Sequence, residues 1–522
     1  MKFPFSTRRA GRRRSSFLAV TALAVTAALA LAGCTAGESA PELAADQTLR
    51  FGFSAEPPKM SATGGTPSTV SYQLYGLVHR GLMTYGADGS VEPGLAESYE
   101  QTSPTSYDFV LRNGLTFQDG SPVTAQDVSN SLLHYSLPET SARSYAGMRY
   151  IESIDVADDT HLTINLTSAN SSFLEYLADP TAFIVPEAAL EPDAEATIGA
   201  GPFQLDDWDP GVGLKLTRFD GYYGAGDVQL DEIDVTFYSD ATARVNALLS
   251  GDVDFIDYVP WESYDQINAT EGYATTGAVG VFQSAFFNVV DGPFSDPLLR
   301  EAVAYAINRD NATDAAFFGF GDALYGIPGA DESGQDLWSY DPERARELLA
   351  EAGYGPGELT IHLASNSTYS FLQDLALSVQ ADLEAVGFVV DFTNPDWATF
   401  TEQAVAGQYD LMIQGNIGNV QDPAAWLPRL VQAPAEANKS FGYSNPELDE
   451  ILAAALAETD PDAKADLLAQ AYEIIAEDVP FATINQRMQS YGASSRVTGF
   501  TVMPGFTQPY SVNNLVSVAM AG

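Results

Sequence analysis

The chain has 522 residues, of which 24 are basic and 70 acidic, so its formal net charge is −46 at pH 7. A surface this acidic repels phosphate backbones and anionic lipid headgroups, which argues against nucleic-acid binding and against charge-driven adsorption to membranes. The single cysteine leaves no pair for an intramolecular disulfide, and a composition that is 45% hydrophobic can fill the cores of two or three domains.

Residues 1–33 have the parts of a secretory signal peptide. Lys2 and five arginines precede an apolar run from Phe17 to Gly33, whose 17 residues fall short of a membrane span, which needs about 20. The run ends in Leu31-Ala32-Gly33-Cys34, which resembles the bacterial lipobox, whose cysteine is lipidated and becomes the mature N-terminus. An ordinary signal peptide with a chance cysteine is the alternative.

Cleavage before Cys34 removes six of the basic residues and no acidic one, so the mature chain carries a net charge near −52. A covalent lipid is then the route to a membrane, and residues 34–46 form a small, polar tether that spans about 20 Å. We expect a lipid-anchored protein on the extracytoplasmic face of the cell membrane. The spacing between Arg13-Arg14 and Phe17-Leu18 favours the general export pathway over the twin-arginine route.

The folded body begins with a predicted strand at residues 48–53, and alternating apolar residues predict a second, half-buried strand around 107–111. Thr124 and Asp127 then form a candidate capping pair. The helix that they open has an apolar face made of Val128, Leu132 and Leu133.

Helices dominate the second half of the sequence. Four helix starts combine a capping residue with a proline at the first helical position: Ser295 or Asp296 before Pro297, Asp341-Pro342 with Gly353 as its stop, Asn445-Pro446 and Asp460-Pro461. An apolar stripe from Phe371 to Val386, ended by Gly387, predicts a further helix. Strands are predicted at 389–392 and 409–413, and helix followed by strand indicates an α/β lobe.

The sequence carries no recognisable catalytic or metal-binding motif. Its four histidines lack metal-ligand spacing, and neither H-E-x-x-H nor G-x-S-x-G occurs. We therefore predict no catalytic residue, no metal site and no cofactor. A secreted hydrolase with a hidden carboxylate pair stays open as an alternative, and so does a surface adhesin.

Six segments, taken in order, resemble the family 5 extracytoplasmic solute-binding proteins, which are the peptide, oligopeptide and nickel receptors of ABC importers. The segments are YGLVHRGLMTYGADGSVEPGLAESYE at 75–100, 107–135, 199–223, 231–254, 293–309 and YDPERARELLAEAGY at 340–354. The resemblance covers nearly all of residues 48–500. It implies a binding protein that works with the permease subunits of an ABC transporter, as a monomer and without catalysis.

The resemblance also implies a two-lobed α/β fold of the periplasmic-binding-protein type, with the ligand cleft between the lobes. Lobe I would comprise residues 47–284, with an inserted subdomain at about 75–186. Lobe II would comprise 285–480, and residues 481–522 would return to lobe I. The chain would cross between the lobes near Gly280–Asn288 and Pro480–Asn485, so that hinge motion closes the lobes over a ligand.

In the dipeptide-binding branch of that family, an aspartate three residues before an Asp-Pro pair grips the ligand's amine. An arginine before the long helix takes the ligand's carboxylate. Here Asp422-Pro423 is present, but Asn419 and Ser367 stand at the two gripping positions. Because both are uncharged, they argue against a free dipeptide held at its charged ends.

Neutral polar residues beside tryptophans favour an oligopeptide held through its backbone, with an oligosaccharide or another polar nutrient as the alternative. The predicted ligand contacts are Asn416, Asn419, Asp422, Trp397, Ser367, Tyr369 and Asn288. A purely structural role stays open as the alternative for several of these residues. Trp397, Trp426 and Trp261 could be core anchors, and Asn416, Asn419 and Asp422 could form turns or helix caps.

Overall fold

The computed structural model describes residues 42–62, 69–140, 144–192, 194–330, 332–416, 421–432 and 439–522. The signal segment, Leu31–Cys34 and all but the end of the tether lie outside the described residues, and so does Asn419. No helix in the described ranges is both long and apolar enough to cross a membrane.

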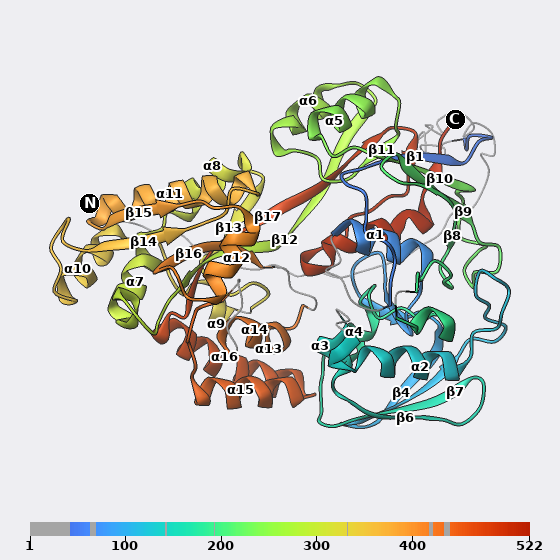
Figure 1. The fold of residues 1–522 in the computed structure, drawn as a ribbon, viewed down its shortest axis with the longest axis horizontal. Helices are drawn as coiled ribbons and strands as arrows, with labels where there is room; N and C mark the ends of the chain where they lie inside the picture. Colours follow the sequence, from blue (N-terminus) through green and yellow to red (C-terminus); the bar gives the residue numbers. More distant parts are fainter. Residues whose placement is uncertain are drawn as a thin grey trace, which may run out of the picture. The chain divides into compact units, whose positions relative to one another are not determined.

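An 11-stranded mixed sheet runs through the described part of the chain (Figure 1). Its strands follow the order β15 (Val389–Thr393), β14 (Thr360–Ala364), β16 (Leu411–Asn416), β12 (Tyr273–Phe287), β17 (Phe481–Ser494), β11 (Phe255–Ile256), β1 (Thr48–Phe53), β10 (Glu232–Phe237), β9 (Gly213–Arg218) and β8 (Phe203–Asp209), with β13 (Gly321–Ala323) paired to β17. Strand β14 is parallel to β15 and β16, and β1 is parallel to β10 and β11. The long antiparallel pair β12 and β17 joins these two groups.

A separate antiparallel sheet lies within residues 96–166, inside the predicted insertion. Its order is β4 (Ala96–Ser103), β5 (Ser106–Leu111), β7 (His161–Leu166) and β6 (Ile151–Val156). Helix α2 (Ala125–Tyr135) contacts β6 and begins with the predicted capping box. The Thr124 N–H donates to Asp127 Oδ2 at 2.9 Å, and the Asp127 N–H donates to Thr124 Oγ1 at 3.3 Å.

The predicted capping residues begin the long helices of the second half. The side chains of Asp296, Asp341, Asn445 and Asp460 accept backbone N–H groups at the starts of α7 (Pro297–Ala306), α10 (Pro342–Glu351), α15 (Pro446–Ala457) and α16 (Pro461–Asp478). Helix α11 (Ser370–Val386) ends at Gly387, whose φ of 121° favours glycine. The structure confirms these predictions. Capping depends on residues that are close in sequence, so the sequence pattern is sufficient to predict it.

The remaining elements complete the described fold. The other helices are α1 (Thr69–Val78), α3 (Tyr145–Met148), α4 (Phe173–Ala178), α5 (Ala241–Ser250), α6 (Tyr264–Ala269), α8 (Arg309–Phe317), α9 (Glu332–Gln335), α12 (Trp397–Val405), α13 (Pro423–Trp426) and α14 (Pro428–Val431). The 3₁₀ segments are η1 (Pro138–Thr140), η2 (Glu187–Leu190), η3 (Trp261–Ser263), η4 (Pro293–Ser295) and η5 (Gly505–Ser517). Two small antiparallel sheets of two strands each pair β2 (Met83–Tyr85) with β3 (Val91–Pro93) and β18 (Val497–Thr498) with β19 (Ala519–Met520).

Two large hydrophobic cores stabilise the described chain. The first is built mainly from residues between Leu49 and Phe255 and between Tyr491 and Met520. The second is built mainly from residues between Phe282 and Ile484. The chain therefore leaves the first core, builds the second and returns to the first.

Strands β12 and β17 carry the backbone from one core to the other. Residues 273–279 of β12 pair with 488–494 of β17, and residues 282–286 pair with 481–486. The register slips between Val279 and Phe282 and again between Gln283 and Ser284. Such irregularities interrupt the hydrogen-bond ladder and bend a strand, so this stretch has the weakest pairing along the two strands.

Gly280 occupies the first register slip, where η5 packs directly on β12. A Cβ atom at this position would lie 2.1 Å from the carbonyl oxygen of Gly505. Because that neighbour is backbone, the contact cannot be relieved by a change of rotamer. The close approach therefore requires glycine at position 280.

We expect Gly280→Ala to lower the free energy of unfolding by about 1–3 kcal/mol, since the added methyl group forces the two backbones apart. Urea unfolding followed by circular dichroism measures the change. The control is Gly226→Ala, because a Cβ atom there meets nothing within 4 Å. Equal stability of the two variants would contradict the close packing of η5 on β12.

Candidate ligand-binding site

Three predicted ligand residues lie together at the start of α11 and α12. Ser367 is exposed, and its N–H and Oγ donate to the Pro395 carbonyl at 2.8 and 3.2 Å. The rings of Tyr369 and Trp397 meet edge to face with centroids 5.9 Å apart, and the two residues are 45% and 40% exposed. Trp397 is thus no core anchor, in contrast to Trp426, which is 1% exposed.

The exposed pair continues inward as a chain of aromatic rings. The ring centroid of Phe371 lies 5.9 Å from that of Tyr369. The centroids of Trp261 and Phe317 lie 5.7 and 5.5 Å from that of Phe371. We call these five residues, with Trp397 included, the aromatic wall. The Trp261 Nε1–H donates to the Met488 carbonyl at 2.9 Å, which attaches the wall to the middle of β17.

The long strands present a row of buried polar side chains that the sequence analysis did not single out. Asn485, Arg487 and Gln489 alternate along β17 and so share one face, and Gln283 is the cross-strand neighbour of Asn485. All four are buried. We call them the polar row.

The polar row is short of hydrogen bonds. Among the described residues, both side-chain polar atoms of Gln283, Asn485 and Gln489 and the Nε of Arg487 have no hydrogen-bond partner. A buried amide without a partner costs about 1–3 kcal/mol. Donors and acceptors gathered on one face of the crossing strands are therefore suited to bind a polar solute.

The other predicted residues have different roles or positions. Asn416 ends β16 opposite Phe282 in the sheet register. Asn288 is buried, with its Nδ2 donating to the Gly407 carbonyl at 2.9 Å and its Oδ1 accepting two backbone N–H groups at 3.1 and 3.3 Å. The backbone thus uses both ends of the Asn288 amide, which makes the residue a turn former in this structure.

Asp422 is both a helix cap and a tie between distant segments. Its Oδ1 accepts the Ala424 N–H at 2.9 Å at the start of α13, which is the cap interpretation left open by the sequence. Its Oδ2 accepts the Ser172 hydroxyl at 2.6 Å and forms an ion pair with Lys464 of α16. Both oxygens are engaged, so Asp422 acts here through protein contacts.

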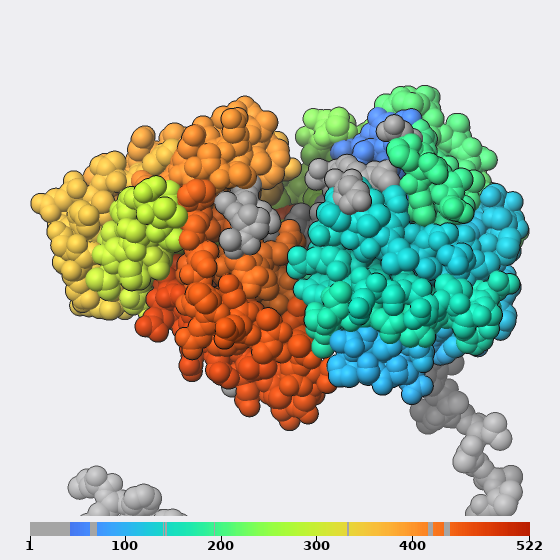
Figure 2. Space-filling model, turned by 60° about the horizontal axis from the view of Figure 1, so that its bottom comes forward, coloured from blue at the N-terminus to red at the C-terminus, as the bar shows by residue number. Residues whose placement is uncertain are grey.

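Polar contacts join two segments that are distant in sequence, and we call the residues that make them the bridge. They are Ser171, Ser172 and Glu175 on one side and Gln421, Asp422, Leu456 and Lys464 on the other. The Ser171 N–H donates to the Leu456 carbonyl at 2.8 Å, and Lys464 Nζ donates to Ser171 Oγ at 2.9 Å. The Gln421 N–H donates to the Glu175 carboxylate at 3.2 Å. Figure 2 shows the blue-green and orange-red surfaces that carry these residues side by side.

Glu175 carries the strongest electrostatic penalty in the bridge. Burial raises the pKa of Glu175 to about 7, and the charge of Asp422 adds to this rise, whereas the Gln421 N–H and the Lys464 ammonium lower it. Ionised Glu175 is therefore disfavoured in the folded protein. The hydrogen bond from Gln421 and the charge of Lys464 favour the carboxylate, and burial outweighs them.

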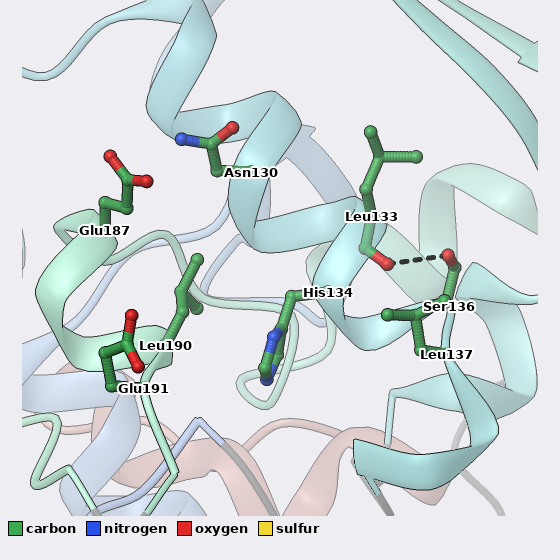
Figure 3. A pocket seen from close by; sticks show the side chains of 8 residues that line it. All are labelled: Asn130, Leu133, His134, Ser136, Leu137, Glu187, Leu190 and Glu191. Atoms are coloured by element: carbon green, nitrogen blue, oxygen red, sulfur yellow. Dashed lines mark hydrogen bonds between the residues drawn. The ribbon is translucent and has the colours of Figure 1, made fainter.

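One surface pocket among the described residues is separate from these groups. It has a volume of about 420 Å³ and lies between α2 and η2 (Figure 3), and it is lined by Asn130, Leu133, His134, Ser136, Leu137, Glu187, Leu190 and Glu191. None of the predicted ligand residues lines it. Across the described residues, no three His, Cys, Asp or Glu side chains are grouped so that they could hold a metal ion.

We expect Glu175→Gln to raise the midpoint of thermal unfolding above that of the wild type at pH 8, because glutamine mimics the protonated carboxyl group. The carboxyl pKa is about 7 in the folded protein and 4.5 in the unfolded chain, so its stabilising proton is lost as pH rises through this window. The advantage of the variant should therefore vanish near pH 4.5. Differential scanning calorimetry across this range measures the difference.

The matched control for this comparison is Glu97→Gln, which changes an exposed glutamate of β4. Its difference from the wild type should stay small and should not vary with pH in the same window. A Glu175→Gln variant that behaves like Glu97→Gln would contradict the buried, proton-binding state of Glu175.

Sequence comparison identifies a family and individual relatives for this chain. The family model for bacterial extracellular solute-binding proteins, family 5 Middle, matches residues 90–438. The glutathione-binding protein GsiB of Escherichia coli (strain K12) is 29% identical over 463 residues, which cover 84% of this chain and 88% of that protein.

Solved structures show the same architecture. The PBP AgaA from A. tumefacien R10, in complex with agropinic acid, superposes with a TM-score of 0.79 at 33% identity, over 91% of this chain and 99% of its own. NikA from Brucella suis, in complex with Fe(III)-EDTA, superposes with a TM-score of 0.81 at 23% identity, over 91% and 100%, a likeness of fold alone. The predicted two-lobed α/β fold class is confirmed. Because the family model spans more than half of the sequence, this chain belongs to the family 5 bacterial extracellular solute-binding proteins.

Proposed function

We propose that this protein is the solute-binding lipoprotein of an ABC importer, capturing an extracellular solute by hinge closure and delivering it to a membrane permease. The observation that supports this most directly is the polar row, whose buried amides lack partners in the described structure and lie on the two strands that connect the cores. The relatives are solute-binding proteins, which supports binding without catalysis.

The closing motion follows from the two strand crossings. Bending at the first register slip of β12 would leave each half of the sheet intact, since that slip separates the two sets of paired residues. A solute that contacts the polar row and the aromatic wall together stabilises the closed form more than the open form. That difference in binding free energy shifts the population towards closure.

An oligopeptide is the solute class that we place first. The amides of Gln283, Asn485 and Gln489 can donate and accept hydrogen bonds along a peptide backbone. Relatives support this class, since GsiB binds glutathione and DppA from Helicobacter pylori was solved with the peptide STSA. The exposed rings of Tyr369 and Trp397 favour the second candidate, an oligosaccharide or another flat polar nutrient.

Native mass spectrometry of freshly purified protein tests the proposed function, because a closed binding protein often retains its solute. We expect one bound solute per chain, and adding that solute back should raise the thermal midpoint and reduce the radius of gyration in small-angle scattering. Turnover of the solute would indicate an enzyme. Stabilisation without compaction would contradict hinge closure.

Lipid anchoring at Cys34 is a second part of the proposal. Replacing Cys34 with alanine should release the protein from the membrane fraction into the medium, because both acyl chains attach through this residue and one chain alone gives only marginal anchoring. Solute affinity should not change. Immunoblots of membrane and medium fractions measure the distribution, and a Cys34→Ala protein that stays with the membrane would contradict the anchor.

A further inference from the structure

Five arginines are largely buried among the described residues: Arg80, Arg244, Arg300, Arg309 and Arg487. Four of them donate hydrogen bonds to backbone carbonyl oxygens. Arg80 Nη1 donates to the Gly76 carbonyl, and Arg244 Nη1 donates to the Tyr238 carbonyl at 2.7 Å. Arg300 Nη1 donates to the Phe294 carbonyl and Arg309 Nε to the Thr483 carbonyl, both at 2.8 Å. These four guanidinium groups are structural.

Arg487 is the exception. Its residue is 8% exposed, its Nε has no hydrogen-bond partner, and no carboxylate oxygen of a described residue lies within 4.0 Å of its guanidinium group. In a chain with 70 acidic and 24 basic residues, a buried cation without an acidic partner calls for an explanation. Burying a charge without a partner is costly, and arginine cannot avoid the cost by losing its proton.

The groups that do surround Arg487 are aromatic rings. The guanidinium carbon lies 5.6 Å from the centroid of Phe371 and 6.0 Å from that of Tyr258, both within the range of cation–π attraction. Phe371 belongs to the aromatic wall and begins α11, whereas Tyr258 follows β11. The cation is therefore contacted by segments that belong to the two different halves of the sheet.

Tyr258 has an unusual backbone. Its φ is +44°, in the left-handed region that few residues other than glycine adopt. Arg244 Nη2 holds this conformation by donating to the Tyr258 carbonyl at 2.7 Å. Strain of this kind persists where the surrounding structure enforces it, and here it accompanies the ring that lies beside Arg487.

We propose that Arg487 binds a carboxylate of the solute, with the Tyr258 and Phe371 rings fixing the plane of the guanidinium group. This inference rests on the proposed solute-binding function. A planar guanidinium group held between rings presents its N–H groups in the fork that matches a carboxylate. The neighbouring amides of the polar row then bind the uncharged remainder of the same solute.

The proposal also explains the uncharged residue at position 367. The resemblance to the dipeptide branch implies a carboxylate-binding arginine before α11, where this chain has Ser367. In the structure, Phe371 at the start of α11 contacts both Arg487 and Tyr369. The positive charge therefore enters the same neighbourhood from strand β17 instead of from the loop.

The test uses the full chain, purified in detergent. Native mass spectrometry identifies any retained solute. After dialysis to remove it, calorimetry measures Kd for tri- to pentapeptides supplied as free C-terminal acids and as carboxamides, with neutral oligosaccharides alongside. For the wild type we expect the acids to bind about 10- to 100-fold more tightly than their carboxamides, the range of a charge-assisted hydrogen bond.

Three variants separate solute binding from a structural role. Arg487→Gln should bind acid and carboxamide equally, and Arg487→Lys should retain part of the preference because it keeps the charge without the planar fork. Without solute, Arg487→Gln should unfold at the same temperature as the wild type or higher, since it removes an unpartnered buried charge. Arg346→Gln, which removes an exposed arginine paired with Glu343, should leave the preference unchanged.

The outcomes are distinct. A retained solute without a carboxylate, or equal binding of acids and carboxamides by the wild type, overturns the proposal for Arg487 and leaves the solute-binding function standing. A solute-free Arg487→Gln protein that is clearly less stable also overturns it, because Arg487 would then be structural. If the wild type retains no solute and binds none of the panel, the proposed function itself fails.

Discussion

The constraint on which the rest of this structure depends is the polar row, whose buried side chains on β12 and β17 lack hydrogen-bond partners among the described residues. Both strands run through the sheet and connect the two cores, and the side chains of the polar row are buried in their middle. Apolar residues would satisfy that burial at no cost, yet this stretch carries Gln283, Asn485, Arg487 and Gln489. A polar row in such a place lowers the stability of the solute-free protein and favours any solute that satisfies it.

The bridge shows how the same protein can hold its two halves together without fixing them permanently. Its contacts are polar and few, and one of them requires a carboxyl group, Glu175, that is disfavoured when ionised. An apolar interface of the same extent would resist separation more strongly, since separation would expose apolar surface to water. Polar contacts of modest strength can be exchanged for water, so they would permit the hinge motion that we propose.

Sequence reasoning succeeded where the determining contacts are local. Asp341 with Pro342 and Thr124 with Asp127 cap helices through residues two or three positions away, so pattern was sufficient. It missed the polar row because Asn485, Arg487 and Gln489 alternate with other residues as an exposed strand face does. Segments that are distant in sequence cover that face, among them those that carry Tyr258 and Phe371. The family resemblance makes Asn288 and Asp422 predicted ligand contacts, and the structure engages both in backbone contacts.

Placing the solute's charge partner on β17 has a mechanical consequence. Arg487 pairs with Gly321 of β13 and lies opposite the first register slip of β12, where the two halves of the sheet meet. Arg487 is also contacted by Tyr258 from one half of the sheet and by Phe371 from the other. A carboxylate bound to Arg487 would therefore act on contacts with both halves of the sheet. Binding of the charge and closure of the site would then occur together.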